Sequence, residues 1–315
     1  MSKSLLRISG AFLAIVALRA QPPDVPDWQK AAGGKMAFDV ASVKPTNRPE
    51  PPSFPLDSGN GKPAGGRFSA SFSLSLYIKF AYKLDAFQSS VASAMLPKWA
   101  TTDMYEIHAT AEGNPTKDQM RLMMQSLLAD RFKLKVHFET QEKPVFALTL
   151  VNAGQTGPML IPHDQGPPCP DSFTLPALGD LPSDSDKEVF PPMCGYAYGF
   201  GNLNGKWRLG IRNSTPQYLA ASISDYGLVA GEVDKPVVDR TGLSGRFDFT
   251  IEYATDPARL FSFFGPGPPK TDAPGEPQGP SFQEALRKQL GLKLVPDKGP
   301  VETLVVDHVE RPSEN

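Results

Sequence analysis

One order of strand and helix patterns occurs twice along this chain, and this repetition constrains its fold more than any other feature. In the first occurrence, residues 65–70 alternate as a short strand, and residues 73–82 carry apolar side chains at helical spacing. Residues 104–109 alternate again, and a capping box at residues 115–119 opens a helix with an apolar Met/Leu face. Residues 132–151 predict two closing strands joined by a short polar turn.

The second occurrence keeps the same order of elements. Residues 205–209 form a strand pattern, and Thr215 followed by Pro216 starts the next helix. Residues 246–253 form a long strand pattern, a capping box opens a helix over residues 281–290, and residues 292–309 read as a closing hairpin. The match lies in the type and order of the elements, because residue-by-residue alignment needs a gap.

This pattern predicts an α+β fold made of two repeated α/β units, each with helices packed on a mostly antiparallel sheet. A single α+β domain without repetition is the alternative. A further strand at residues 38–45 is expected to pair with the strand that ends at Val309 and to tie the units together. The expected parts after residue 20 are an N-terminal strand with a Pro-rich segment (21–64), the first repeat (65–154), a Pro/Gly-rich insertion (155–204) and the second repeat (205–315) with a Pro-rich loop (256–280).

The N-terminus has the pattern of a signal peptide over residues 1–20. Lys3 and Arg7 precede an apolar run from Ile8 to Leu18, and cleavage is expected after Ala20. The run is short for a membrane span, so no transmembrane segment is expected after cleavage, and an uncleaved anchor is the alternative. The expected location is therefore periplasmic or secreted.

The charge balance argues against a nucleic-acid partner. The chain has 32 basic and 34 acidic residues. The full chain has a formal net charge of −2. Removing residues 1–20 removes three basic residues and no acidic one, so the remaining chain is more negative. No Lys/Arg stripe of the kind that neutralises phosphates is present in the sequence.

Two cysteines, Cys169 and Cys194, flank part of the Pro/Gly-rich insertion. In an exported chain the expected use is a disulfide, which would stabilise the fold by about 3 kcal/mol through the entropy of the closed loop. A nucleophilic thiolate is the alternative, and it needs a nearby base and a reducing compartment.

Several motifs resemble one known family. They occupy residues 38–45, 127–134, 238–248, 289–294 and 306–312, in that order. Together they resemble the soil-associated protein family, a domain of unknown function expanded in soil Acidobacteria. The resemblance implies no activity and no catalytic residues, although related domains occur on membrane metallopeptidases similar to β-lactam sensors, which implies sensing or binding. This chain has no His-Glu-x-x-His motif of such a peptidase.

The densest polar group in the sequence surrounds a glycine-containing turn at residues 241–245. It consists of Asp239, Arg240, Arg246 and Asp248. Two Arg side chains beside flexible glycines predict a site that binds an anion or a carboxylate. The alternative is that the acids and bases fix the turn that leads into the long strand.

An aromatic, glycine-rich stretch at residues 195–202 is the second candidate for binding. Tyr196, Tyr198 and Phe200 lie there beside Cys194 and predict a recognition loop. The alternative is that these rings cover the edge of the core.

Catalytic and metal sites are not predicted, and no cofactor is expected. The four histidines, His108, His137, His163 and His308, contain no pair at the i, i+4 spacing of a zinc-binding helix. Ser244 lacks the flanking pattern of a nucleophile elbow.

These observations favour an exported, noncatalytic module that binds a protein, peptide or cell-envelope component. One alternative is an extracytoplasmic hydrolase that uses acidic residues in the cleft between the two copies; Asp103, Glu106 and Glu112 are acids whose separation the sequence leaves open. Another is a sensor that partners a membrane peptidase or transporter.

Overall fold

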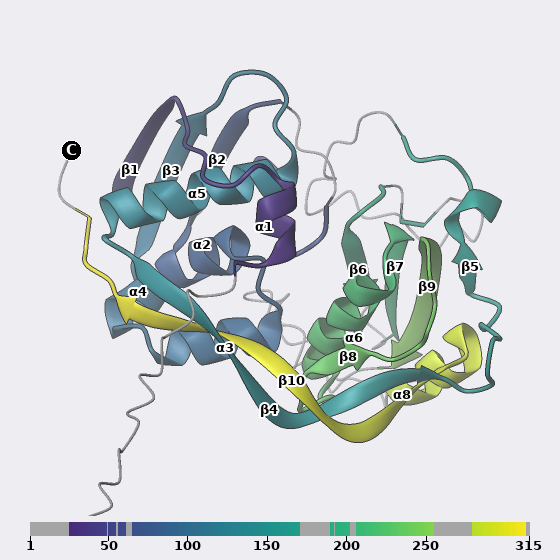
Figure 1. Ribbon diagram of the computed structural model, residues 1–315. Helices are drawn as coiled ribbons and strands as arrows, with labels where there is room; N and C mark the ends of the chain where they lie inside the picture. The colour runs from purple at the N-terminus through teal and green to yellow at the C-terminus, as the bar shows by residue number, and fades with distance from the viewer. Residues whose placement is uncertain are drawn as a thin grey trace, which may run out of the picture.

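The computed structural model describes residues 25–48, 50–54, 56–60, 65–170, 190–191, 193–201, 206–254 and 279–312 (Figure 1). The expected signal peptide lies outside these residues, as do the middle of the insertion and nearly all of the Pro-rich loop at 256–280. None of the helices in the described ranges has the length and hydropathy needed to cross a bilayer.

The N-terminal part is a three-stranded antiparallel sheet covered by helices. Its strands are β1 (Val40–Thr46), β2 (Arg67–Ser73) and β3 (Met104–Thr110), in the order β1-β3-β2. Its helices are α1 (Asp27–Ala31), α2 (Leu74–Ala81), α3 (Ala86–Ala94), α4 (Lys98–Thr102) and α5 (Lys117–Arg131). The expected pairing of the first strand with the end of the chain is wrong, because β1 pairs with β3 along its whole length.

Helix α5 forms as its sequence predicts. The Thr116 hydroxyl accepts a hydrogen bond from the Gln119 N–H (3.2 Å), and the Gln119 side chain accepts one from the Thr116 N–H (2.8 Å). These bonds satisfy two N–H groups that a helix start leaves without partners. The buried apolar face includes Met120, Met123, Met124, Leu127 and Leu128.

The C-terminal part holds a second sheet, with the order β5-β9-β7-β6. Its strands are β5 (Leu160–Pro162), β6 (Ala197–Gly201), β7 (Lys206–Ser214) and β9 (Phe247–Ala254). Its helices are α6 (Pro216–Ala230), α8 (Phe282–Ala285) and the π-helical turn η2 (Leu286–Leu290), and a short 3-10 turn, η1 (His163–Gln165), follows β5. Thr215 caps α6 and Pro216 takes its first position, as expected.

A long two-stranded ribbon replaces the two expected closing hairpins. Strands β4 (Lys135–Leu150) and β10 (Leu292–His308) pair antiparallel with each other from Leu292↔Leu150 to His308↔Lys135. Strand β8 (Val237–Asp239) adds to β4 in parallel. The polar stretches that resembled turns lie in the middle of the ribbon, where both strands are largely exposed. Exposure to water therefore explains their polarity.

The ribbon connects two hydrophobic cores. Phe138 and Leu304 pack in the core of the N-terminal part, whereas Leu148 and Leu292 pack in the core of the C-terminal part. Each strand thus runs from one core to the other, as Figure 1 shows for the teal and yellow strands that cross together beneath both parts. The α+β class and the mostly antiparallel sheets are confirmed.

Both parts have a left-handed residue shortly after their last helix. Lys133 lies two residues past the end of α5 and Gly291 lies directly after η2, with φ of 51° and 67°. A buried leucine comes next in each case: Leu134 immediately precedes ribbon strand β4, and Leu292 is the first residue of ribbon strand β10. This shared order supports our proposal that the two parts are copies of one unit.

Candidate functional site

The four polar residues around the 241–245 turn separate into two places. Asp239 Oδ1 accepts hydrogen bonds from the Thr241 N–H (2.9 Å) and hydroxyl (2.7 Å), so Asp239 caps its own turn. The Arg240 N–H donates to the Leu148 carbonyl in the ribbon (2.9 Å). Among the described residues, no hydrogen bond or ion pair joins Asp239 or Arg240 to Arg246 or Asp248.

Arg246 and Asp248 instead meet at Asn213, on the neighbouring strand. The Arg246 guanidinium donates to the Asn213 carbonyl (2.8 Å), and Asp248 Oδ1 accepts from the Asn213 N–H (2.8 Å). Asp248 Oδ1 also lies 2.6 Å from His163 Nδ1. The Asp248 carboxylate is 9% exposed; these contacts all reach Oδ1, whereas Oδ2 lies 3.7 Å from Arg212 Nε without a hydrogen-bond partner among the described residues.

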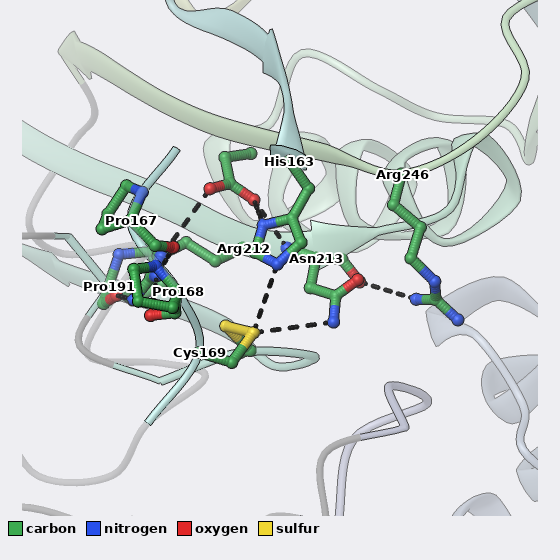
Figure 2. The surroundings of a disulfide bond; sticks show 10 residues. His163, Pro167, Pro168, Cys169, Pro191, Arg212, Asn213 and Arg246 are labelled. Carbon is green, nitrogen blue, oxygen red and sulfur yellow. Dashed lines mark hydrogen bonds and ion pairs between the residues drawn. A yellow bond between two sulfur atoms is a disulfide. The ribbon is translucent and has the colours of Figure 1, made fainter. Parts of the chain in front are cut away.

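Cys169 and Cys194 form the expected disulfide beside this group (Figure 2). Cys169 Sγ lies 3.4 Å from His163 Nε2 and 3.6 Å from Asn213 Nδ2. Figure 2 shows the His163 ring above the sulfur of Cys169, with the dashed contact between them. The sequence predicted the disulfide, but it did not predict that His163 and Asn213 contact Cys169.

A buried arginine holds the insertion on the sheet. Arg212 is 3% exposed, and its guanidinium donates to the carbonyls of Pro167, Pro168 (2.8 Å) and Pro191 (3.5 Å). Proline has no N–H, so the carbonyl is the backbone group through which these residues can be anchored. Next to Pro167, residue 166 must be a glycine for the chain to approach Asp248 this closely, because a Cβ there would lie 2.5 Å from Asp248 Oδ2.

The side of the second sheet that faces the insertion carries an aromatic and charged cluster. Tyr198 lies opposite Gly210, and Arg208 lies opposite Glu252, so alternation places these side chains on one face. The Phe190 ring stands 5.8 Å from the Tyr198 ring and 4.8 Å from the Arg208 guanidinium. We call the surface formed by Phe190, Tyr198, Arg208, Glu252 and Ile161 the insertion face.

The predicted aromatic loop is largely a strand, since Tyr198 and Phe200 lie within β6. Tyr196 precedes that strand and is 5% exposed, with its ring 4.7 Å from the Lys117 ammonium. Tyr196 therefore contributes to packing between the two parts. The side chain of Phe200 lies outside the described structure.

Two groups of side chains in the described residues have metal-ligand spacing. His163, Cys169 and Cys194 place their ligand atoms within 4.8 Å of one another, but both sulfurs are bonded in the disulfide. The second group joins Glu50, Glu106 and His108, which is also an ion-pair cluster on the surface.

The acids and remaining histidines considered from sequence mostly form separate surface pairs. Asp103 pairs with Arg311 (2.6 Å), and Glu106 pairs with His108 (2.7 Å). Hydrogen bonds that His137 donates to Asp307 and then to Glu139 raise the pKa of His137.

A buried charged cluster, absent from the sequence-based candidates, lies between the two parts. The Lys117 ammonium pairs with Asp57 Oδ1, and the Tyr218 hydroxyl of α6 donates to Asp57 Oδ2. Arg121 donates to the carbonyls of Asp57 (2.8 Å) and Gly59 (2.7 Å). Lys117 is 1% exposed and Arg121 0%. We call Asp57, Lys117, Arg121 and Tyr218 the interface clasp.

Burial and pairing set the ionisation of the clasp. Burial lowers the pKa of Lys117 to about 7, even though Asp57 opposes this shift. For Asp57, burial raises the pKa, but Lys117 and the hydrogen bonds from Lys117 and Tyr218 outweigh it and leave the pKa below its usual value. The bonds of this cluster join the N-terminal segment, α5 and α6.

Comparison with models of known protein families identifies the family of this chain. A family model described as Protein of unknown function (DUF3738) matches residues 75–309. The chain belongs to this family. The expectation of an uncharacterised domain family is thereby confirmed. No match was found among curated proteins or among solved structures. The residues matched by the DUF3738 model include the insertion, His163 and Asp248, whereas Asp57 of the clasp lies before them.

Within the DUF3738 region, a second contact between the two parts involves α3 and α6. Asp225 Oδ1 accepts a hydrogen bond from the Ala86 N–H (2.7 Å) at the start of α3. Burial raises the pKa of Asp225 to about 6; nearby Lys79 opposes the shift and Asp85 adds to it.

This pKa predicts how stability depends on pH. The folded-state value of about 6 lies above the ordinary value of 3.8, so the folded chain binds the proton more tightly than the unfolded chain. The stabilising contribution is fully present below about pH 3.8 and is lost as the pH rises through 6.

We therefore expect Asp225→Asn to raise the free energy of unfolding by about 1 to 2 kcal/mol at pH 7.5 and to change it little near pH 4. Urea unfolding at both pH values measures the difference. Asp234→Asn is the matched control, since the Asp234 side chain is 77% exposed. Equal effects of Asp225→Asn at the two pH values would contradict the expected role.

Proposed function

We propose that this protein is an exported interaction module that binds a protein or peptide partner through the insertion face. The observation that carries the proposal is the contact of Phe190 with both Tyr198 and Arg208: the Phe190 and Tyr198 rings are tilted, with centroids 5.8 Å apart, and the Arg208 guanidinium lies 4.8 Å from the Phe190 ring. Tyr and Arg contribute disproportionately to the binding energy of protein interfaces. Here they are half-buried and already arranged by contact with one another.

The anchoring of the residues beside this face supports the proposal. The disulfide joins Cys169 to Cys194, and Arg212 binds the carbonyls of Pro167, Pro168 and Pro191. Binding loses less conformational entropy when the residues beside the site are already held in place. Loops held on a rigid sheet are also common places for recognition residues.

The disulfide is also compatible with a location outside the cytoplasm, because such bonds persist in oxidising compartments. Together with the signal-peptide pattern of residues 1–20, it supports the proposed periplasmic or secreted location. A cell-envelope protein would meet the insertion face in that location.

Panning a random-peptide phage library against the full-length chain tests this function. We expect enriched peptides to lose about 30-fold in affinity for Arg208→Ala, which corresponds to about 2 kcal/mol at an interface hot spot. Arg208→Lys should lose nearly as much, because Lys keeps the charge but not the planar group that stacks on Phe190.

Arg287→Ala is the matched control for this experiment, since Arg287 is an exposed arginine on η2, outside the insertion face. Its affinity should equal that of the wild type. If the library yields no enriched peptide, or if the peptides bind Arg208→Ala and the wild type equally well, the proposed function is wrong.

A further inference from the structure

The disulfide has two chemically different ends. Cys169 Sγ lies 3.4 Å from His163 Nε2 and 3.6 Å from Asn213 Nδ2, whereas no such nitrogen contact is present at Cys194 among the described residues. Both cysteines are partly exposed. An attacking reagent can therefore reach a bond whose two sulfurs have different surroundings.

The contact with Asp248 decides which nitrogen of His163 faces the sulfur. A carboxylate only accepts hydrogen bonds, so the Nδ1 atom 2.6 Å from Asp248 Oδ1 carries the proton. Nε2 then faces Cys169, as a lone pair in the neutral ring and as an N–H donor in the protonated ring. A protonated His163 can thus give a proton to Cys169.

Asn213 is also held in place to face the same sulfur. Its backbone is left-handed (φ 58°), a conformation uncommon for residues other than glycine but more frequent for Asn. Asp248 accepts its N–H and Arg246 donates to its carbonyl, which fix this conformation. Its side-chain amide then points at Cys169.

We propose that Cys169–Cys194 is a reactive disulfide that thiols open, with Cys169 as the departing sulfur, His163 as its proton donor and Asp248 and Asn213 as positioning residues. The substrate class is a thiol, either a small molecule or an exposed dithiol on a partner protein. This activity goes beyond the proposed binding function and stands without it, because its test uses a small thiol.

The reaction balances as thiol–disulfide exchange. A thiolate attacks Cys194 Sγ, the S–S bond breaks, and the electron pair leaves on Cys169, which takes the proton from His163. A second thiolate attacks the mixed disulfide at the reagent's sulfur and releases Cys194 as a thiolate, which takes a proton from water. Two thiols are oxidised to one disulfide, and the protein disulfide is reduced to two thiols.

The closing experiment treats the folded full-length chain with excess 2-mercaptoethanol, quenches it early with iodoacetamide and maps both cysteines by mass spectrometry. We expect the reagent on Cys194 and the alkyl group on Cys169. His163→Gln and Asp248→Asn should each slow opening about tenfold or more near pH 6.5. Equal labelling of the two cysteines overturns the proposal.

His137→Gln is the matched control, because His137 also bonds a carboxylate, Asp307 at 2.9 Å, but is distant in sequence from the disulfide and has no sulfur contact. Its opening rate should equal that of the wild type. A rate for His163→Gln equal to the wild-type rate overturns the proposal.

If the disulfide opens as expected but no peptide binds, only the proposed function is contradicted. If peptides bind but the disulfide does not open as expected, only this inference is contradicted.

Discussion

Replacing Asp57 with asparagine should lower the free energy of unfolding by about 3 to 5 kcal/mol at pH 6. The pKa of Lys117 is about 7, so its ammonium is charged at that pH. The amide oxygen of the new side chain could still accept the Tyr218 hydroxyl, but the buried charge of Lys117 would lose its carboxylate partner. Guanidinium unfolding monitored by circular dichroism measures the change.

Two further variants separate loss of the charge pair from general damage at the site. Lys117→Met combined with Asp57→Asn removes both charges, so the double variant should be more stable than Asp57→Asn alone. Asp234→Asn removes an exposed partner of Lys235 and should change stability by less than about 1 kcal/mol. If Asp57→Asn costs no more than Asp234→Asn, the clasp does not join the two parts.

Replacing both cysteines with serine should lower the free energy of unfolding by about 3 kcal/mol, because the unfolded chain regains the freedom of a loop whose ends are 25 residues apart. The same unfolding experiment measures this loss, with the oxidised wild type as reference. The effect should be centred on the C-terminal part, where Arg212 binds the carbonyls of Pro168 and Pro191 beside the two cysteines.

The reduced wild type is the control for the serine variant. It removes the same crosslink while keeping both sulfur atoms, so its stability should agree with that of the double serine variant to within about half a kcal/mol. A loss below about 1 kcal/mol in both forms would show that Arg212 and its prolyl contacts hold the insertion without the covalent bond.

Local signals predicted where α5 and α6 begin, but they did not predict α1, α3 or α4. The Thr116 and Gln119 capping box and the Thr215-Pro216 start lie where their sequence patterns place them, because each depends on neighbours a few residues away. The disulfide followed from having two cysteines in a chain expected to be exported.

Strand pairing was harder to predict, because it depends on distant partners. The polar residues near Glu142 and Lys143 resembled a turn, yet they continue one strand whose partner lies more than a hundred residues later. An exposed ribbon and a turn both favour polar side chains, so composition does not distinguish them. The wrong partner expected for β1 has the same cause.

The candidate sites show the same limit. Asp248 was one of the polar candidates, but its partners His163 and Asn213 come from other elements. Spacing rules for histidines test only neighbours along the chain, so they could not find a His163–Asp248–Cys169 contact. Asp57 lay in a Pro-rich segment, and nothing local marked it as the partner of a buried lysine.

Hydrogen–deuterium exchange tests the central claim, that the insertion face is the binding surface, most directly. The full chain would be measured with and without a peptide enriched from the library. We predict that bound peptide slows exchange in residues 159–170, 197–201 and 206–214, which include Cys169 and strands β5, β6 and β7. Protection confined to the N-terminal sheet or to the exposed middle of the ribbon would contradict the claim.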